Sequence, residues 1–359
     1  MPLYKSLKNY LPWTQAPLIA NAPMSGAATS ELAIAVTRAG GLGQIGFLDD
    51  MRELSSQLDI VRHGLRDVMA TLDNSQQLPV GLGVIVFGSP IEAWMRLFTT
   101  YKPVVAWLSF ASTAELKQWT ERIRQASPDT RVWIQLGSVQ AAIEAAQACR
   151  PDALVIQGGD AGGHGHSNGA SVLTLLPEVA DVLQDHEISE IPLIAAGGIV
   201  DGRGCAAALT LGASGVVMGT RFLAAPETHI PQIYRNAILA ASDGGQTTAR
   251  SRVFDEIWGP NFWPMIYDGR CLRNKVYDQY TGGMSIQNIR LWLHAAMNGV
   301  NSEDLKTEDM GSVWAGTGVG MVKKMNSAAD IVREVQEETR RRIDSTAKLS
   351  EFQGQGSVV

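Results

Sequence analysis

One short block of the sequence, Gln157-Gly158-Gly159-Asp160-Ala161-Gly162-Gly163-His164, carries most of its recognisable chemistry. Gln157 ends an apolar run, and its amide can donate and accept hydrogen bonds toward a heteroaromatic ring. The glycines lack Cβ atoms, so the backbone can pass close to a flat ligand. His164 follows them, and an imidazole can act as a general base near neutral pH. A loop histidine often makes only local hydrogen bonds, but its position among glycines favours catalysis. We therefore predict that His164 is catalytic.

Two other glycine-containing segments predict an anion site. Ala196-Gly197-Gly198-Ile199 ends one apolar run, and Met218-Gly219-Thr220 ends the next one. Backbone N–H groups without a neighbouring Cβ can approach a phosphate, and the Thr220 hydroxyl can donate to it. A lone Gly-Gly pair would indicate only a tight turn, whereas two such endings favour phosphate binding. Because the chain contains no Walker-type Gly-Lys-Ser/Thr and no Gly-x-Gly-x-x-Gly directly following the first strand, we expect a mononucleotide-type cofactor.

Metal and thiol chemistry are less well supported. Asp160, His164 and His166 could suggest a metal site, but neighbouring loop ligands need a third and fourth partner that the sequence does not display. We therefore predict no metal. The three cysteines, Cys149, Cys205 and Cys271, are an odd and sparse set without a neighbouring base. They predict a reducing compartment, no disulfide framework and no thiolate nucleophile.

These residues need a scaffold of alternating strands and helices. The predicted strands are Leu18–Ala22, Gly43–Gly46, Val80–Val86, Val104–Ser109, Val132–Leu136, Ala153–Gln157, Leu193–Ala196 and Gly215–Met218. The predicted helices between them are Ser30–Ala39, Met51–Leu72, Ile91–Thr99, Thr113–Gln125, Val139–Cys149, Ser171–Gln184 and Gly202–Leu211. Several strands are apolar on both faces, as in parallel sheets covered by helices. The pattern favours an α/β fold, a TIM (β/α)8 barrel, over the competing doubly wound open sheet.

The alternation stops after Ala225. Helices are predicted at Thr228–Ala249, Ser285–Met297 and Ser327–Arg342, and the segment 252–280 is rich in aromatic residues. These aromatic side chains could cover a substrate or simply pack the core of a lid. The expected domains are a barrel formed by residues 1–225 and 312–345, a helical cap inserted at 226–311, and a flexible tail at 346–359.

Composition narrows the function classes. The chain has 359 residues, 45% of them hydrophobic, and a formal net charge of −6. This composition excludes global disorder, and the acidic balance argues against nucleic acid or anionic membranes as partners. No signal peptide or membrane span stands out, so a soluble, cytoplasmic protein is expected. The 36 glycines are an excess over average proteins. The oligomeric state is open, and a homodimer is compatible with the sequence.

The motifs together resemble the nitronate monooxygenase family, formerly called 2-nitropropane dioxygenases. The resemblance rests on Ala22-Pro23-Met24, the block from Gln157 to His164, residues 196–199 and residues 218–222. It implies a TIM-type barrel with non-covalent FMN and an inserted helical domain. By the same resemblance, the flavin-binding residues correspond to Ala22, Pro23, Met24, Gln157, Gly162, Gly197, Gly198, Met218, Gly219 and Thr220. His164 corresponds to the catalytic histidine of the family.

One position departs from the family pattern. Many bacterial members carry an asparagine after Gly-Val on the third strand, where it contacts the flavin. Here Gly83-Val84 is followed by Ile85, and Asn21 on the first strand is not an obvious substitute.

The resemblance implies oxidation of alkyl nitronates by O2 to carbonyl compounds and nitrite. With a neutral nitroalkane, His164 would first remove the α-proton. The same barrel and motifs also fit a flavin-dependent enoyl-thioester reductase or an NAD(P)H:quinone reductase. A non-catalytic flavin-binding or sensory module is the third alternative.

Overall fold

Eight parallel strands lie where the apolar runs predict them. The computed structural model describes residues 4–297 and 311–351. The strands form one sheet in the order β1-β9-β8-β6-β5-β4-β3-β2. Their bounds are β1 Leu18–Asn21, β2 Gln44–Ile45, β3 Leu78–Ile85, β4 Pro103–Ser109, β5 Arg131–Leu136, β6 Ala153–Gln157, β8 Leu193–Ala196 and β9 Gly215–Met218. A parallel bridge between Ala20 and Leu42 joins the two edges, so the predicted (β/α)8 barrel is confirmed.

The helices around the barrel also follow the prediction, with one break. They are α2 Ser30–Arg38, α3 Met51–Gly64, α4 Arg66–Met69, α5 Ile91–Tyr101, α6 Thr113–Ala126, α7 Val139–Cys149, α8 Val172–Asp185, α9 Gly202–Thr210 and α10 Thr220–Leu223. Asp50 caps α3 and Ser112 caps α6 through side-chain hydrogen bonds to backbone N–H groups. The predicted helix Met51–Leu72 is not continuous, because Leu65 adopts φ −118° and ψ 21° between α3 and α4.

The barrel interior is filled by side chains and covered at its amino-terminal end. Trp107 and Trp133 pack inside it with ring centroids 6.3 Å apart. Leu7, from α1 (Tyr4–Lys8), belongs to the same apolar cluster, and Trp133 Nε1 donates a hydrogen bond to the Tyr10 hydroxyl 3.1 Å away. Because the N-terminal segment covers this end, a ligand must enter at the carboxyl ends of the strands.

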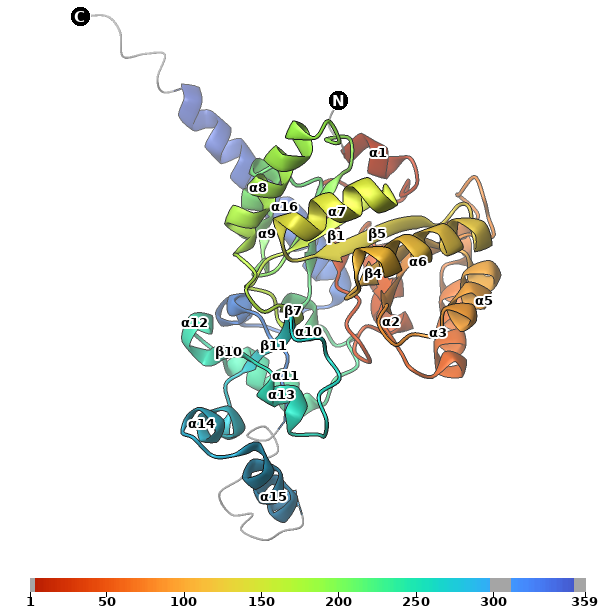
Figure 1. The fold of residues 1–359 in the computed structure, drawn as a ribbon. Coiled ribbons are helices and arrows are strands. Elements are labelled where there is room, and N and C mark those ends of the chain that lie inside the picture. The colour runs from red at the N-terminus through yellow and green to blue at the C-terminus, as the bar shows by residue number, and fades with distance from the viewer. Residues whose placement is uncertain (1–3, 298–310, 352–359) are drawn as a thin grey trace, which may run out of the picture.

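The segment after Ala225 combines helices with a small sheet. Its helices are α11 Gln232–Ala240, α12 Gly244–Thr247, α13 Val253–Glu256, α14 Lys275–Thr281 and α15 Ile286–Met297, and its strands are β10 Thr248–Ser251 and β11 Tyr267–Leu272. Figure 1 shows α14 and α15 far from the barrel. The predicted helix Thr228–Ala249 is therefore wrong as one continuous element. It ends at Ala240, and Asp243 next to Gly244 adopts a left-handed conformation with φ 46°.

The last residues of the glycine block form a strand instead of the expected loop. β7 Gly163–His166 pairs with β11, which also pairs with β10, in an antiparallel three-stranded sheet. Within this sheet His164 lies opposite Gly269. The glycine block, residues 157–164, therefore joins the barrel to the inserted segment. The pairing with β11 also fixes the backbone position of His164.

The C-terminal helix is longer than predicted. α16 runs from Ala328 to Glu351 and packs on α9, where Glu338 Oε2 accepts a hydrogen bond from the Gly202 N–H at 2.9 Å. Residues 346–351, predicted as the start of the flexible tail, continue this helix, and they contain no Gly or Pro to end it. The rest of that tail, 352–359, and residues 298–310 of the predicted cap lie outside the described residues. Within residues 4–297 and 311–351, no helix is long and apolar enough to span a bilayer.

Candidate active site

A cavity of about 560 Å³ lies at the carboxyl ends of the barrel strands. This volume falls in the range of about 300–1,000 Å³ that is usual for cofactor and substrate pockets. Every residue predicted for the site except Met218 lines it: Ala22, Pro23, Met24, Gln157, Gly162, His164, Gly197, Gly198, Gly219 and Thr220. The fold therefore brings together residues that are distributed over some two hundred positions of the chain.

Met218 supports the cavity from behind. Its side chain is fully buried in the apolar layer between the strands and the surrounding helices, and its carbonyl accepts a hydrogen bond from the Ala22 N–H at 2.9 Å. This bond holds the end of β1 against the end of β9. Met218 is thus the one predicted site residue that does not line the cavity, and its contact with the cofactor stays a prediction.

The end of the first strand packs closely on its neighbours. A Cβ atom on Gly83 of β3 would come within 2.5 Å of Pro23 Cβ, so only glycine allows this contact. A Cβ atom on Gly219 would lie 3.6 Å from Ala22 Cβ and 3.7 Å from Met24 Sδ. The Ala22–Met24 segment thus forms a rigid part of the cavity wall next to Gly219.

The Gly197-Gly198 pair forms the turn after β8 in a conformation that favours glycine. Gly197 has φ 104° and Gly198 has φ 74°, both in the left-handed region. A Cβ atom on Gly197 would also come within 2.8 Å of the Gly158 carbonyl oxygen. The Gly197-Gly198 pair therefore makes a tight turn and also presents its backbone to the cavity.

The segment around Gly316 closes the same side of the cavity. Thr220 Oγ1 accepts a hydrogen bond from the Gly316 N–H at 3.0 Å, and the hydroxyl hydrogen stays available for a second partner. A Cβ atom on Gly162 would lie 2.4 Å from the Ala315 carbonyl carbon, so the two backbones touch there. These contacts join the loops after β6 and β9 through a segment distant from both in sequence.

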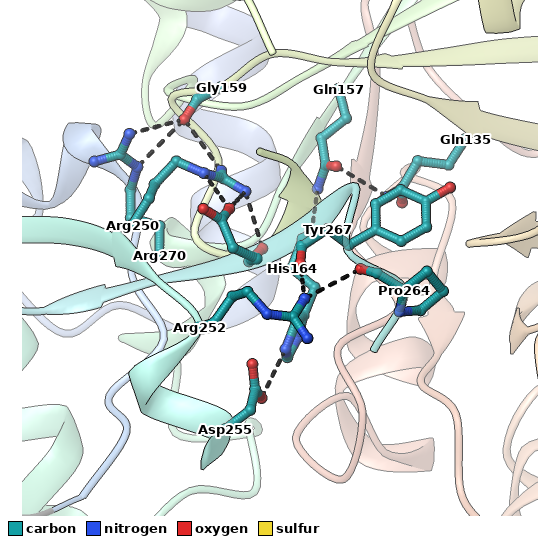
Figure 2. Close-up of polar contacts among 11 residues, drawn as sticks. Gln135, Gln157, Gly159, His164, Arg250, Arg252, Asp255, Pro264, Tyr267 and Arg270 are labelled. Atoms are coloured by element: carbon teal, nitrogen blue, oxygen red, sulfur yellow. Dashed lines mark hydrogen bonds and ion pairs between the residues drawn. The ribbon is translucent and has the colours of Figure 1, made fainter. Parts of the chain in front are cut away.

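A chain of amide hydrogen bonds fixes Gln157. Trp107 Nε1 donates to Gln135 Oε1 at 3.1 Å, and Gln135 Nε2 donates to Gln157 Oε1 at 3.0 Å. Gln157 Nε2 then donates to the His164 carbonyl oxygen at 3.1 Å, as Figure 2 shows. The chain crosses strands β4, β5 and β6, so the Gln157 amide is held in one orientation at the cavity wall.

The His164 side chain is held by a carboxylate and by aromatic rings. Its Nε2 atom lies 2.9 Å from Asp255 Oδ1, and the two side chains are only 16% and 14% exposed (Figure 2). The Trp263 ring stacks on the imidazole with centroids 3.7 Å apart and planes within 10°. The Trp314 ring lies 4.7 Å away at a tilt of 44°. The imidazole orientation is therefore strongly restricted.

Arginine side chains fix the segments that carry these groups. The Arg252 guanidinium donates to the carbonyl oxygens of Trp263, Pro264 and Tyr267 at 3.0, 3.2 and 3.0 Å. The Arg270 guanidinium donates through Nε and Nη2 to the Gly159 carbonyl oxygen at 3.2 and 3.0 Å (Figure 2). Both the aromatic segment and the glycine block are thus anchored by charged donors in partly buried surroundings.

A model of the nitronate monooxygenase family matches residues 88–338 of the chain. The chain belongs to this family. It is similar to nitronate monooxygenase npaC of Metarhizium robertsii, with 39% identity over 94% of each chain. It is also similar to a nitronate monooxygenase of Neurospora crassa, with 35% identity over 94% of this chain and 93% of the relative.

A solved structure supports the fold. The chain matches nitroalkane oxidase from Streptomyces ansochromogenes with a TM-score of 0.70 and 22% identity, covering 94% of this chain and 99% of that one. The nitronate monooxygenase family consists of enzymes, so the chain is an oxidoreductase, and membership implies a flavin cofactor.

The residues of the cavity fit such a cofactor. The Gln157 amide and the Met24 thioether suit a flat heteroaromatic ring. The Gly197-Gly198 turn offers backbone without a Cβ atom, and the Thr220 hydroxyl can donate to an anion. In the described part of the chain, no three His, Cys, Asp or Glu side chains cluster as metal ligands would.

The departure from bacterial members of the nitronate monooxygenase family lies on the cavity wall. Ile85, at the position where many of them have asparagine, lines the cavity. Asn21 does not replace that amide, since it is fully buried and bonded to the Gln44 backbone. Its Oδ1 accepts from the Gln44 N–H and its Nδ2 donates to the Gln44 carbonyl, both at 2.9 Å. This wall is therefore more apolar than an asparagine would make it.

Sequence reasoning missed Asp255 and Trp314, which both contact the His164 side chain. The sequence does show a carboxylate within the aromatic-rich segment. The residues around Asp255 do not indicate which histidine it contacts. Trp263 belongs to the aromatic-rich segment, for which the sequence allows either a substrate cover or the core of a lid. Its stacking on His164 places it at the site.

Proposed function

We propose that this chain is an FMN-dependent nitronate monooxygenase that oxidises small alkyl nitronates with O2 to carbonyl compounds and nitrite. The observation that carries the proposal is His164, held by Asp255 in the wall of a cavity that suits a flavin. The names of the two fungal relatives support the substrate class.

The cavity residues divide into two groups in this proposal. Ala22–Met24, Gln157 and Gly162 contact the ring system, and the turns at Gly197-Gly198 and Gly219-Thr220 bind the phosphate. A mononucleotide agrees with a chain in which no dinucleotide fingerprint directly follows the first strand. When bound, FMN supplies the electron transfer from substrate to O2.

His164 acts on neutral nitroalkanes, which must lose a proton before they become nitronates. The imidazole accepts the α-proton and gives it up again when solvent returns to the cavity. Nitronates already lack this proton, so their oxidation depends less on His164. The segment 226–311 serves as a cap whose aromatic side chains, Trp263 among them, keep water from the substrate.

Cofactor analysis and two anaerobic mixing experiments test the proposal. We expect a yellow protein that releases FMN on denaturation and loses its visible flavin absorbance when mixed with a nitronate. Mixing with NADH or NADPH should leave that absorbance unchanged. Rapid loss with reduced nicotinamide, and none with nitronate, would instead indicate an enoyl-thioester or quinone reductase. A colourless protein that does not take up added FMN would contradict the cofactor assignment.

A further inference from the structure

Asp255 reaches the cavity from the segment inserted after the barrel. It lies on α13, 91 residues after His164, and its Oδ1 atom contacts His164 Nε2. The other carboxylate oxygen, Oδ2, is buried and has no hydrogen-bond partner among the described residues. Among the described residues, His164 therefore provides the side-chain contact of this carboxylate. Because a buried ionised carboxylate needs a hydrogen-bond donor, it favours a hydrogen on the His164 nitrogen that faces it.

The contact selects one tautomer of His164. An ionised carboxylate only accepts hydrogen bonds, so the hydrogen of a neutral imidazole must lie on Nε2. Nδ1 then carries the free lone pair. Within residues 4–297 and 311–351, no group forms a hydrogen bond to Nδ1. Nδ1 is also not one of the buried side-chain atoms that lack a hydrogen-bond partner. His164 lines the cavity, so Nδ1 is the ring nitrogen available to a reactant.

We propose that Asp255 is the positioning residue for His164, holding it as the Nε2–H tautomer so that Nδ1 serves as the base for nitroalkanes. The inference rests on the proposed function and adds the residue and the atom through which the proton moves. Trp263 restricts rotation of the ring by stacking, and its aromatic face stabilises the imidazolium that forms.

The proposed step is a proton transfer without redox chemistry. The α-carbon–hydrogen bond of the nitroalkane breaks, and the proton goes to His164 Nδ1. The electron pair of that bond forms the carbon–nitrogen double bond, and the negative charge moves onto the nitro oxygens. The products are a nitronate and an imidazolium whose Nε2–H faces the Asp255 carboxylate. A nitronate supplied directly does not need this step.

The kinetic test is Asp255→Asn, which keeps the side-chain shape but allows an amide NH₂ to face Nε2. We expect kcat/KM for a nitroalkane to fall about 100-fold, the scale of general-base catalysis. The value for the matching nitronate should stay near wild type, and the isotope effect with α-deuterated nitroalkane should rise. Equal losses on both substrates, or no loss on either, would overturn the positioning role.

Glu256→Gln is the matched control, since it makes the same chemical change one residue further along α13 without contacting His164. Glu256 lies 3.8 Å from Arg252 Nε and is 28% exposed. We expect this variant to keep the wild-type ratio of nitroalkane to nitronate turnover. A loss of the same size and selectivity as in Asp255→Asn would show that any disturbance of α13 has this effect, and would overturn the inference.

A measurement on the wild-type protein does not depend on turnover. The ¹⁵N chemical shifts of the imidazole nitrogens distinguish a protonated from a bare ring nitrogen, and His164→Asn assigns the signal among the six histidines. We expect neutral His164 to carry its hydrogen on Nε2. A hydrogen on Nδ1 would overturn the inference even if nitroalkanes are oxidised. If wild type oxidises neither substrate, the proposed function fails, whereas this tautomer result stands by itself.

Discussion

Gly269 faces the ring of Trp314 so closely that a Cβ atom on Gly269 would lie 2.2 Å from a ring carbon. Gly269 is also the residue opposite His164 in the small sheet, and Trp314 lies against the His164 imidazole. Because Gly269 on β11 has no side chain, the Trp314 ring can pack against the His164 imidazole.

Gly269→Ala should therefore disturb both packing and catalysis. The added methyl group must displace Trp314 or bend the sheet, at about 1–3 kcal/mol of unfolding free energy. Chemical denaturation measures this loss, and nitroalkane turnover should fall with it. Wild-type stability together with wild-type turnover would show that Trp314 moves aside freely and does not restrict His164.

His164→Asn should retain the flavin and lose nitroalkane turnover selectively. Removing the base should lower kcat/KM for a nitroalkane by about 10²–10⁴-fold. Nitronate turnover should fall much less, because the substrate is already deprotonated. Steady-state kinetics on the two substrates, with the flavin content measured by absorbance, checks this. Equal losses would contradict the role of His164 as a base.

Gly197→Ala should weaken flavin binding, and the chain offers a matched control. Gly197 and Gly212 have nearly the same conformation, with φ 104° and 103°, but Gly212 has open space around its missing Cβ and does not line the cavity. Each substitution should lower the unfolding free energy by about 1–2 kcal/mol through left-handed strain. Gly197→Ala should cost more than Gly212→Ala, because its Cβ would lie 2.8 Å from the Gly158 carbonyl oxygen. Only Gly197→Ala should also raise the Kd for flavin, as measured by titration of the apoprotein. Equal flavin affinity in both variants would argue against a role of this turn in the cofactor site.

Thr220→Val tests the phosphate end of the cavity. It removes the acceptor of the Gly316 N–H and the hydroxyl donor proposed for the phosphate, at about 0.5–1.5 kcal/mol for the lost hydrogen bond. FMN affinity should fall, whereas affinity for riboflavin, which has no phosphate, should change less. Thr220→Ser should restore FMN binding. A parallel loss for both flavins would place the phosphate elsewhere.

Thiol reagents should not inactivate the folded enzyme. All three cysteines are buried, and burial raises the pKa of the Cys205 thiol to about 11 and that of Cys149 and Cys271 above the usual value. Because the thiolate is the reactive form, iodoacetamide at neutral pH should leave mass and activity unchanged. The unfolded chain, as control, should take up three labels. Rapid inactivation of the native enzyme would reveal a reactive thiol.

The barrel could be predicted from local signals. Strands such as Val104–Ser109 are apolar on both faces, and glycines mark the ends of the strands that form the cavity. The positions of Gln157, His164 and Gly197-Gly198 follow from these local patterns once the strands close into a barrel. Strand ends differ slightly, as where β3 begins at Leu78 instead of Val80, and the helix predicted at Met51–Leu72 breaks at Leu65.

The histidine environment could not be predicted, because it depends on contacts between distant segments. Asp255 meets His164 only after β7 and β11 have paired, and this pairing converts an expected loop into a strand. The continuous helix expected from Thr228 to Ala249 fails for a more local reason, the Asp243-Gly244 turn. Met218 is predicted from its neighbours in sequence, and it lies outside the cavity lining because alternate residues of a strand face opposite sides.

The most direct test of the central claim is an aerobic assay of the FMN-loaded enzyme with propyl-2-nitronate, following O2, acetone and nitrite together. The account predicts O2 consumption with acetone and nitrite formed in equal amounts, at a rate well above that of free FMN. Unchanged nitronate in the presence of fully loaded enzyme and O2 would contradict it.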